Sequence, residues 1–184
     1  MNKDFMYGIG AVKYKNKKVG YIAKNSFDLG GTKPESAEVE AEQVPGAPVL
    51  VIPQSNGKIG PKFDMIQLSF ESLQQLLGGS LHKKGEKVTG WTAPRKIIVL
   101  DGPWELELVS GQSVLIPNAT LLSDLGGKLT LTETAKIEVE LKVAAPVADK
   151  VPPYGVFDSA ELPTEWSADN GWLLPEETES TPGS

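Results

Sequence analysis

Residues 136–143 read Lys-Ile-Glu-Val-Glu-Leu-Lys-Val, and they decide the fold class because apolar and charged side chains alternate without a break. Successive side chains of a β-strand point to opposite faces, so this alternation predicts a strand with one apolar and one charged face. Similar alternation occurs at residues 37–42, 104–108 and 129–132. Such strands are typical of antiparallel sheets with one side on a core. The sequence therefore predicts a mainly β protein.

Further strands are expected on both sides of these segments. The short runs 48–52 and 96–100 are predominantly apolar, and we interpret them as buried strands. A late pair of amphipathic strands is expected at 127–133 and 136–144. Turn signals such as Asn56-Gly57 separate the strands.

One segment has helical rather than strand periodicity. Its apolar residues recur three and four positions apart, at Phe70, Leu73, Leu76 and Leu77. Ser69 precedes them as a potential N-cap, and Gly78 follows as a potential C-terminal stop. We therefore predict one short α-helix, at about 70–77, that packs on a sheet.

The chain has 184 residues, a length that suits one domain with an added arm. It contains no cysteine and a single histidine, His82. These counts exclude disulfide scaffolds, thiol nucleophiles, thiolate zinc sites and multi-histidine metal sites. No run reaches the roughly 18 apolar residues of a membrane span, and the N-terminus lacks the apolar stretch of a signal peptide. We expect a protein made in the cytoplasm, with no cofactor, metal or membrane partner.

The net charge of −6 is distributed in blocks. Residues 1–33 sum to +5, residues 34–47 to −4 and residues 82–96 to +4. Opposite charged patches attract and steer association, so these blocks favour faces that meet other copies or partners. A solvated surface with uneven charge is the alternative. Residues 151–184 hold seven acids and no base, so most of the acidity belongs to the C-terminal end.

The composition changes beyond Val143. Residues 146–184 contain six prolines and end in an acidic polar stretch, a composition that disfavours a packed core. We therefore divide the chain into a β-domain at 1–146 and a Pro-rich acidic C-terminal arm at 147–184. The candidate anchors that dock this arm, in cis or on a neighbour, are Phe157, Trp166 and Trp172. Residues 175–184 are expected to be mobile, and their deletion to leave assembly intact.

Nucleotide and nucleophile motifs are absent from the sequence. Gly57-Lys58 and Gly127-Lys128 are followed by Ile and Leu, whereas a P-loop needs Ser or Thr there. His82 lies in a cationic turn after the helix, and no Gly-x-Ser-x-Gly elbow accompanies it. The basic block 82–96 includes Trp91 and has the charge to contact phosphate, although the acidic remainder opposes binding to nucleic acid.

Two carboxylate pairs, Glu105/Glu107 and Glu138/Glu140, share a strand face. Carboxyl groups two residues apart on a strand lie about 6–7 Å from each other, a separation that suits a glycosidase. Alternating acids are also common on the exposed face of a half-buried strand, and we favour that interpretation. We assign no catalytic, cofactor-binding or metal-binding residues and expect no enzyme.

The order of residues in the N-terminal segment resembles that of a known protein family. It runs Tyr7-Gly-Ile-Gly-Ala-Val-Lys-Tyr14, then a Lys/Asn turn, then Val19-Gly-Tyr-Ile-Ala-Lys-Asn-Ser-Phe-Asp-Leu-Gly30-Gly31. This resembles the opening hairpin of the major tail tube proteins of long-tailed bacteriophages. The acidic strand at 35–42, the apolar run at 48–52, the short helix and the late strand pair follow in the same order. The resemblance covers about residues 5–146.

The resemblance implies two packed antiparallel sheets forming a sandwich or partly open barrel, with one flanking helix. It also implies homohexameric rings that stack helically into the tail tube of the virion, whose channel passes double-stranded DNA during genome ejection without specific binding. Tail terminator, tape-measure and baseplate-type proteins are the partners that it implies. The candidate lumen-facing residues are Glu38, Glu40, Glu42, Glu138 and Glu140. The loop at 26–47 is expected to become ordered through neighbouring subunits.

Two other readings stay open. A capsid decoration or head–tail joining protein would bind shells or a single ring without polymerising. A monomeric β-sandwich module that binds carbohydrate would use tryptophan side chains as stacking platforms. The candidates for such platforms are Trp91, Trp104, Trp166 and Trp172.

Overall fold

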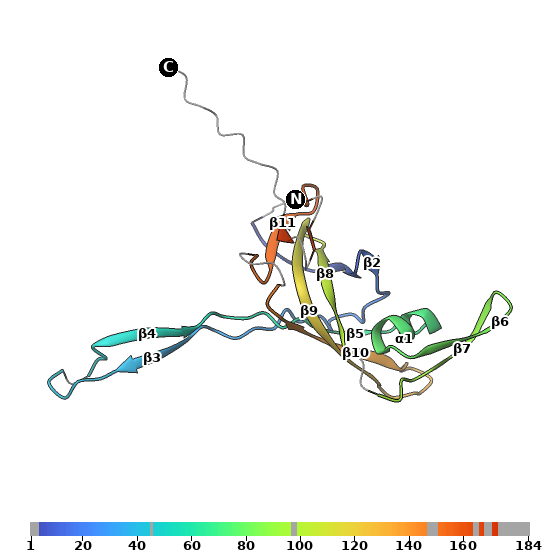
Figure 1. The fold of residues 1–184 in the computed structure, drawn as a ribbon, viewed down its shortest axis with the longest axis horizontal. Helices are drawn as coiled ribbons and strands as arrows, with labels where there is room; N and C mark the ends of the chain where they lie inside the picture. Colours follow the sequence, from blue (N-terminus) through green and yellow to red (C-terminus); the bar gives the residue numbers. More distant parts are fainter. Residues whose placement is uncertain are drawn as a thin grey trace, which may run out of the picture.

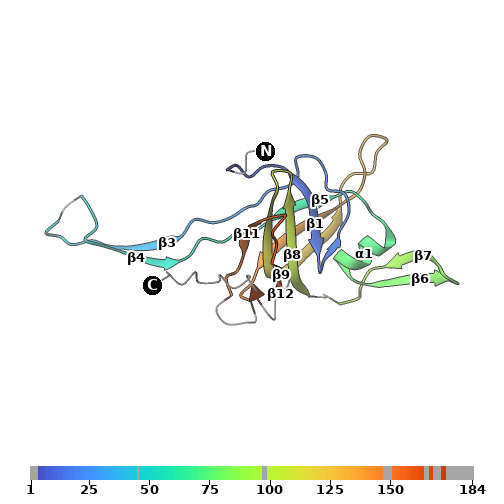
Figure 2. The same ribbon diagram turned by 90° about the horizontal axis from the view of Figure 1, so that it is seen from above.

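The structure is a computed structural model that describes residues 4–44, 46–96, 99–146, 151–163, 166–167 and 171–172. The chain is mainly β, with antiparallel sheets in a sandwich-like arrangement and one short helix among the described residues. The predicted fold class is therefore confirmed. Figures 1 and 2 show a central sheet from which two hairpins extend on opposite sides.

Seven strands form the main sheet, in the order β2-β1-β8-β9-β10-β5, with β11 also paired to β9. Their bounds are β1 Ile9–Tyr14, β2 Lys17–Lys18, β5 Lys62–Met65, β8 Leu100–Leu108, β9 Gln112–Gly126, β10 Lys136–Val143 and β11 Gly155–Asp158. The long strand β9 is the centre of the sheet. It pairs with β8 along one edge, and with β11 and then β10 along the other.

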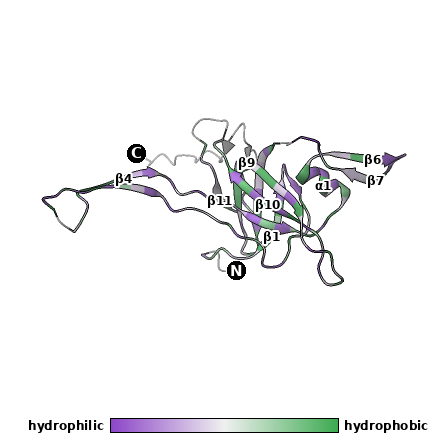
Figure 3. Ribbon diagram, turned by 90° about the horizontal axis from the view of Figure 1, so that it is seen from below, coloured by the Kyte–Doolittle hydropathy of each residue, from purple (hydrophilic) through white to green (hydrophobic). Residues whose placement is uncertain are grey.

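The hydrophobic core lies on one face of this sheet. On β10 the residues Ile137, Val139 and Leu141 are buried, as the alternation predicts. Phe63 and Met65 of β5 join them, and green and purple alternate along the strands in Figure 3. The sheet therefore takes its stability from the period-two pattern that identified it.

Strand β8 is covered on both faces. Trp104 and Leu106 are fully buried in the core, and Trp104 stacks on Tyr14 with ring centroids 4.5 Å apart. Glu105 and its pairing partner Leu115 point the other way and are buried as well. Both faces of the sheet are therefore buried at this part of β8.

The predicted helix is confirmed residue for residue as α1, Phe70–Leu77. The Ser69 hydroxyl accepts a hydrogen bond from the Ser72 N–H, which satisfies one of the free donors of the first turn. Gly78 ends the helix with a φ of 71°. Leu73 and Leu76 are buried in the core, so packing holds this two-turn helix in place.

The two projecting hairpins are separate two-stranded sheets. One consists of β3, Glu35–Val39, and β4, Leu50–Ser55. The other consists of β6, Ser80–Lys84, and β7, Lys87–Thr92, and it lies next to α1. The segment 26–47, expected to be a loop, thus contains the strand β3 at Glu35–Val39.

Three strand predictions need correction. The run 48–52 enters strand β4 but is exposed rather than buried, apart from half-buried Pro48. In the run 96–100, Val99 is exposed and the strand begins at Leu100, while residues 97–98 lie outside the described residues. Residues 127–133 form no strand, because β9 extends to Gly126 instead and is the partner of β10.

Part of the predicted C-terminal arm joins the main sheet. Strand β11 pairs with β9 from Gly155 to Asp158, and half-buried Phe157 lies opposite Ser113. The backbones of β12, Trp166–Ser167, and β13, Gly171–Trp172, pair with each other. The side chains of Trp166 and Trp172, and residues 175–184 with their predicted mobility, lie outside the described residues.

Candidate assembly surfaces

The β3–β4 hairpin exposes an unusual amount of apolar surface. We call this hairpin the arm; it is a different segment from the C-terminal arm at 147–184. Val49, Leu50, Val51 and Ile52 are between 45% and 52% exposed, and they alternate between the two faces of the hairpin. Neither outer edge of the arm has a strand partner within the described ranges. Exposed apolar strands with free edges are typical sites for pairing with another chain.

The root of the arm continues the antiparallel ladder of the body. Isolated bridges join Ile22 to Met65, Asp28 to Lys62 and Thr32 to Lys58, between the segment before β3 and the segment after β4. A Cβ added to Gly30 would lie 2.4 Å from the carbonyl oxygen of Gly60, and Gly30 has a φ of 60°. The two paired segments at the root therefore approach each other so closely at this point that only glycine fits.

The arm is uniformly acidic. Glu35, Glu38, Glu40 and Glu42 are exposed, and residues 34–57 contain no lysine or arginine. In the described part of the chain, no ion pair neutralises Glu38, Glu40 or Glu42. These three candidate lumen residues thus lie together on the arm and its tip, apart from the main sheet.

The second hairpin, β6–β7, has the opposite charge. Lys83, Lys84 and Lys87 are exposed along it. His82 lies on β6 rather than in a turn, and its Nε2 is 3.2 Å from the Thr92 hydroxyl across the hairpin. Half-buried Trp91 donates a hydrogen bond to the Gly78 carbonyl at 2.8 Å, which ties the hairpin to the end of α1. The two projecting elements therefore present opposite charges on opposite sides of the body (Figure 1).

The other two candidate lumen residues, Glu138 and Glu140, belong to a neutral network on the charged face of β10. Lys136 contacts Asp64 at 2.7 Å and Glu138 at 2.9 Å, and these hydrogen bonds raise the pKa of Lys136. Hydrogen bonds from Lys142 and Lys62 lower the pKa of Glu140. The carboxylates of β10 are therefore balanced by lysines, unlike the glutamates of the arm.

The carboxylate pair Glu105/Glu107 is held by a lysine. Lys13 of β1 contacts Glu105 at 2.9 Å and Glu107 at 3.3 Å. Burial by itself lowers the pKa of Lys13, but the hydrogen bonds and charges of both glutamates outweigh it and raise that pKa overall. Because Glu105 is buried, this arrangement resembles a structural ion pair more than a pair of glycosidase carboxylates.

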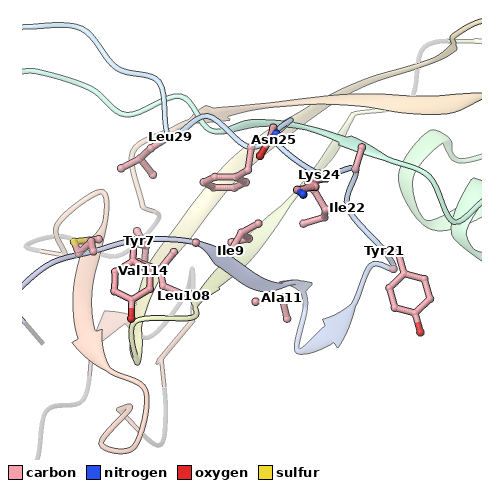
Figure 4. Close-up of a pocket in the computed structure, with 16 residues that line it drawn as sticks. Tyr7, Ile9, Ala11, Tyr21, Ile22, Lys24, Asn25, Leu29, Leu108 and Val114 are labelled. Carbon is pink, nitrogen blue, oxygen red and sulfur yellow. The ribbon is translucent and has the colours of Figure 1, made fainter. Parts of the chain in front are cut away.

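A groove that the sequence did not predict lies beside β1 (Figure 4). Its volume is about 570 Å³, and its apolar wall includes Ile9, Ile22, Leu29, Leu108 and Val114. Figure 4 shows these side chains coming from β1, from the segment that follows β2, and from β8 and β9. No sequence signal identified the groove, because its walls come from segments about 100 residues apart.

The structure also bears on the tryptophans proposed as sugar platforms. Trp104 is completely buried, so neither face of its indole ring is accessible to a ligand. Trp91 is half-buried, and the side chains of the other two lie outside the described residues.

The described residues contain neither a candidate metal site nor a candidate membrane-spanning helix. No group of three or more His, Cys, Asp or Glu side chains is arranged to hold a metal ion there. No helix within the described ranges has the length and apolar character needed to cross a membrane.

No protein-family model matches the chain, and no curated protein matches it significantly. Inferences about function therefore rest on the residues and surfaces described above.

Proposed function

We propose that this chain is a structural virion protein, a subunit of hexameric rings that stack into the tail tube of a long-tailed bacteriophage. Such a subunit performs no catalysis, and it needs surfaces that bind identical copies. The tube would form a channel in the virion tail after synthesis of the subunit in the bacterial cytoplasm. The same proposal makes the tail terminator, tape-measure and baseplate proteins its further partners.

The observation that carries this proposal is the arm. Its apolar side chains stay exposed on both faces, and both edges are open to strand pairing within the described chain. A soluble protein rarely keeps such a surface uncovered unless another molecule covers it. An acidic arm and basic surfaces elsewhere on the same chain favour contacts between different surfaces of two copies. Head-to-tail contacts of that type generate rings or filaments.

The channel follows from the same arrangement. Double-stranded DNA is densely negative, so a wall without a basic excess lets it pass without sticking. The candidate lumen residues offer two such walls. The arm carries unbalanced glutamates, whereas Glu138 and Glu140 lie on a neutral face with Lys62, Lys136 and Lys142.

Electron microscopy of the purified chain tests the proposal. Negative-stain images over a range of protein and salt concentrations should show rings or long tubes. Only monomers under all conditions would contradict self-assembly. Single rings or shell binding without stacking would favour the alternative, a capsid decoration or head–tail joining protein.

A pair of variants links the assembly to the arm. Val51→Glu places a charge on the exposed apolar face and should abolish rings and tubes. Gln74→Glu adds the same charge at an exposed position of α1 and should assemble like the parent chain. Equal loss of assembly in both variants would show that net charge, rather than the arm, controls it.

A further inference from the structure

The groove beside β1 has the features of a docking site. Tyr21 is 73% exposed and Tyr7 is 51% exposed at its rim, and the wall between them is largely apolar. Tyrosine rings around an apolar depression are frequent in protein–protein interfaces, because they provide a large contact area. Figure 4 shows Tyr7 and Tyr21 on either side of the labelled wall residues.

One wall of the groove is a free strand edge. β2 pairs only with Lys13 and Tyr14, at the end of β1. The edge of residues 9–11 that faces away from β8 therefore has no strand partner in the described part of the chain. Open backbone N–H and C=O groups on such an edge accept an added strand from another chain.

The charge around the groove is opposite to that of the arm. Residues 15–24 contain four lysines and no acid, whereas residues 34–57 contain four glutamates and no base. Of these lysines Lys24 lines the groove, and the other three precede it in the same segment. The groove and the arm are thus complementary in charge as well as in apolar character.

We propose that β4 of one copy docks in this groove of a neighbouring copy and adds residues 50–52 alongside β1. The inference rests on the proposed function, for which it names the contact between copies. Figure 2 shows β3 and β4 leading away from β1, so the arm of the same copy does not occupy the groove. Pro53 follows the docked residues directly, and because proline lacks a backbone N–H it limits the added pairing to the short stretch 50–52.

The basic β6–β7 hairpin is the competing acceptor for the acidic arm. Its apolar residues Leu81, Val88 and Trp91 are already half-buried by its own chain. It therefore offers charge without an open apolar groove, which is why the groove beside β1 is the better match.

Cross-linking between copies tests this contact directly, because the natural chain has no cysteine. Ile52→Cys on the arm is mixed with Tyr21→Cys at the groove, and separately with Thr89→Cys on β7. All three positions are exposed, so the variants should fold. A short bismaleimide reagent followed by mass spectrometry identifies the joined peptides, and sedimentation of the same samples reports assembly.

The expected result is a 52–21 cross-link in assembled material and no 52–89 cross-link. Assemblies that yield 52–89, 52–52 or no cross-link would overturn the docking site while leaving the tube function standing. A sample that never assembles would instead overturn the proposed function.

Charge reversal gives an independent measurement. The triple variant Lys17→Glu/Lys18→Glu/Lys24→Glu should raise the protein concentration needed for assembly about tenfold, because like charges would then meet. The matched triple variant Lys83→Glu/Lys84→Glu/Lys87→Glu should change it by less than about twofold. The reverse ranking would identify β6–β7 as the acceptor and contradict the groove.

Discussion

The main sheet and the arm are built from similar apolar strands, yet they differ in what covers them. Val139 and Leu141 of β10 are 3% and 0% exposed, whereas Val51 and Ile52 of β4 are 50% and 45% exposed. The apolar residues of β10 are covered by the hydrophobic core of the same chain, to which α1 contributes Leu73 and Leu76. The difference teaches that an apolar strand can form a hairpin within its own chain and still leave its side chains uncovered and its outer edge unpaired in the described part of the chain.

The largest contrast should appear in the energetics of single side chains. Trp104→Ala removes a fully buried ring and should lower the free energy of unfolding by about 3–5 kcal/mol. Ile52→Ala on the arm should lower it by less than about 0.5 kcal/mol in the monomer, because little surface is buried there. Denaturant unfolding measures both. Equal effects would mean that the arm packs on the body.

The next contrast concerns charge pairs. Lys13→Met leaves the buried Glu105 without its cation and should cost about 2–3 kcal/mol of unfolding free energy. Lys62→Met removes a pair with Glu140 on the exposed face and should cost less than about 1 kcal/mol. The same denaturant series compares them. If the two values agree, Glu105 has another stabilising partner.

The root of the arm can be loosened without disturbing the sheet. Gly30→Ala should cost about 1–3 kcal/mol locally, because its Cβ would meet the Gly60 carbonyl in a left-handed backbone conformation. Gly46→Ala at the tip, which has a positive φ but no atom within 4 Å of the added Cβ, should cost less. Hydrogen exchange at Thr32 and Lys58 should accelerate in the first variant alone. Slow exchange at these two residues in both variants would show that the root of the arm tolerates a side chain at position 30.

The smallest effect is a pH dependence of the charged face of β10. Hydrogen bonds from Lys142 and Lys62 lower the pKa of Glu140, so the folded state binds this proton less readily than the unfolded state. Its stabilisation is thus present above the ordinary glutamate pKa and is lost as the pH falls through the lower, folded value. Denaturation midpoints of the parent chain and Glu140→Gln should therefore differ at pH 7 and converge in acid. A constant difference would contradict this coupling.

Local signals in the sequence predicted local structure well. The helix at Phe70–Leu77 was found because its cap, its periodicity and its terminal glycine all lie within ten residues of one another. The buried face of β10 was found for a similar reason. Each of these elements carries its own signal, and tertiary contacts reinforce it.

The wrong predictions concern segments whose structure or burial depends on residues far away in the sequence or on another chain. Residues 48–52 look like a buried strand because an apolar run has the same sequence whether its own chain or another covers it. Leu129 and Leu131 alternate with threonines as strand residues do, yet the Thr130 hydroxyl accepts hydrogen bonds from the Thr132 and Glu133 N–H groups and forms a turn. The groove beside β1 combines segments distant in sequence, so no single stretch could reveal it.

The prolines around the arm affect how readily the newly made chain aggregates. Pro34 and Pro48 flank the two strands and Pro53 lies within β4, while β3 contains Glu35 and Glu38. Proline and charge on an edge strand hinder indiscriminate stacking into aggregates. The arm can therefore remain in solution at high protein concentration. Only an acceptor surface that matches both the apolar face and the charge of the arm would then bind it.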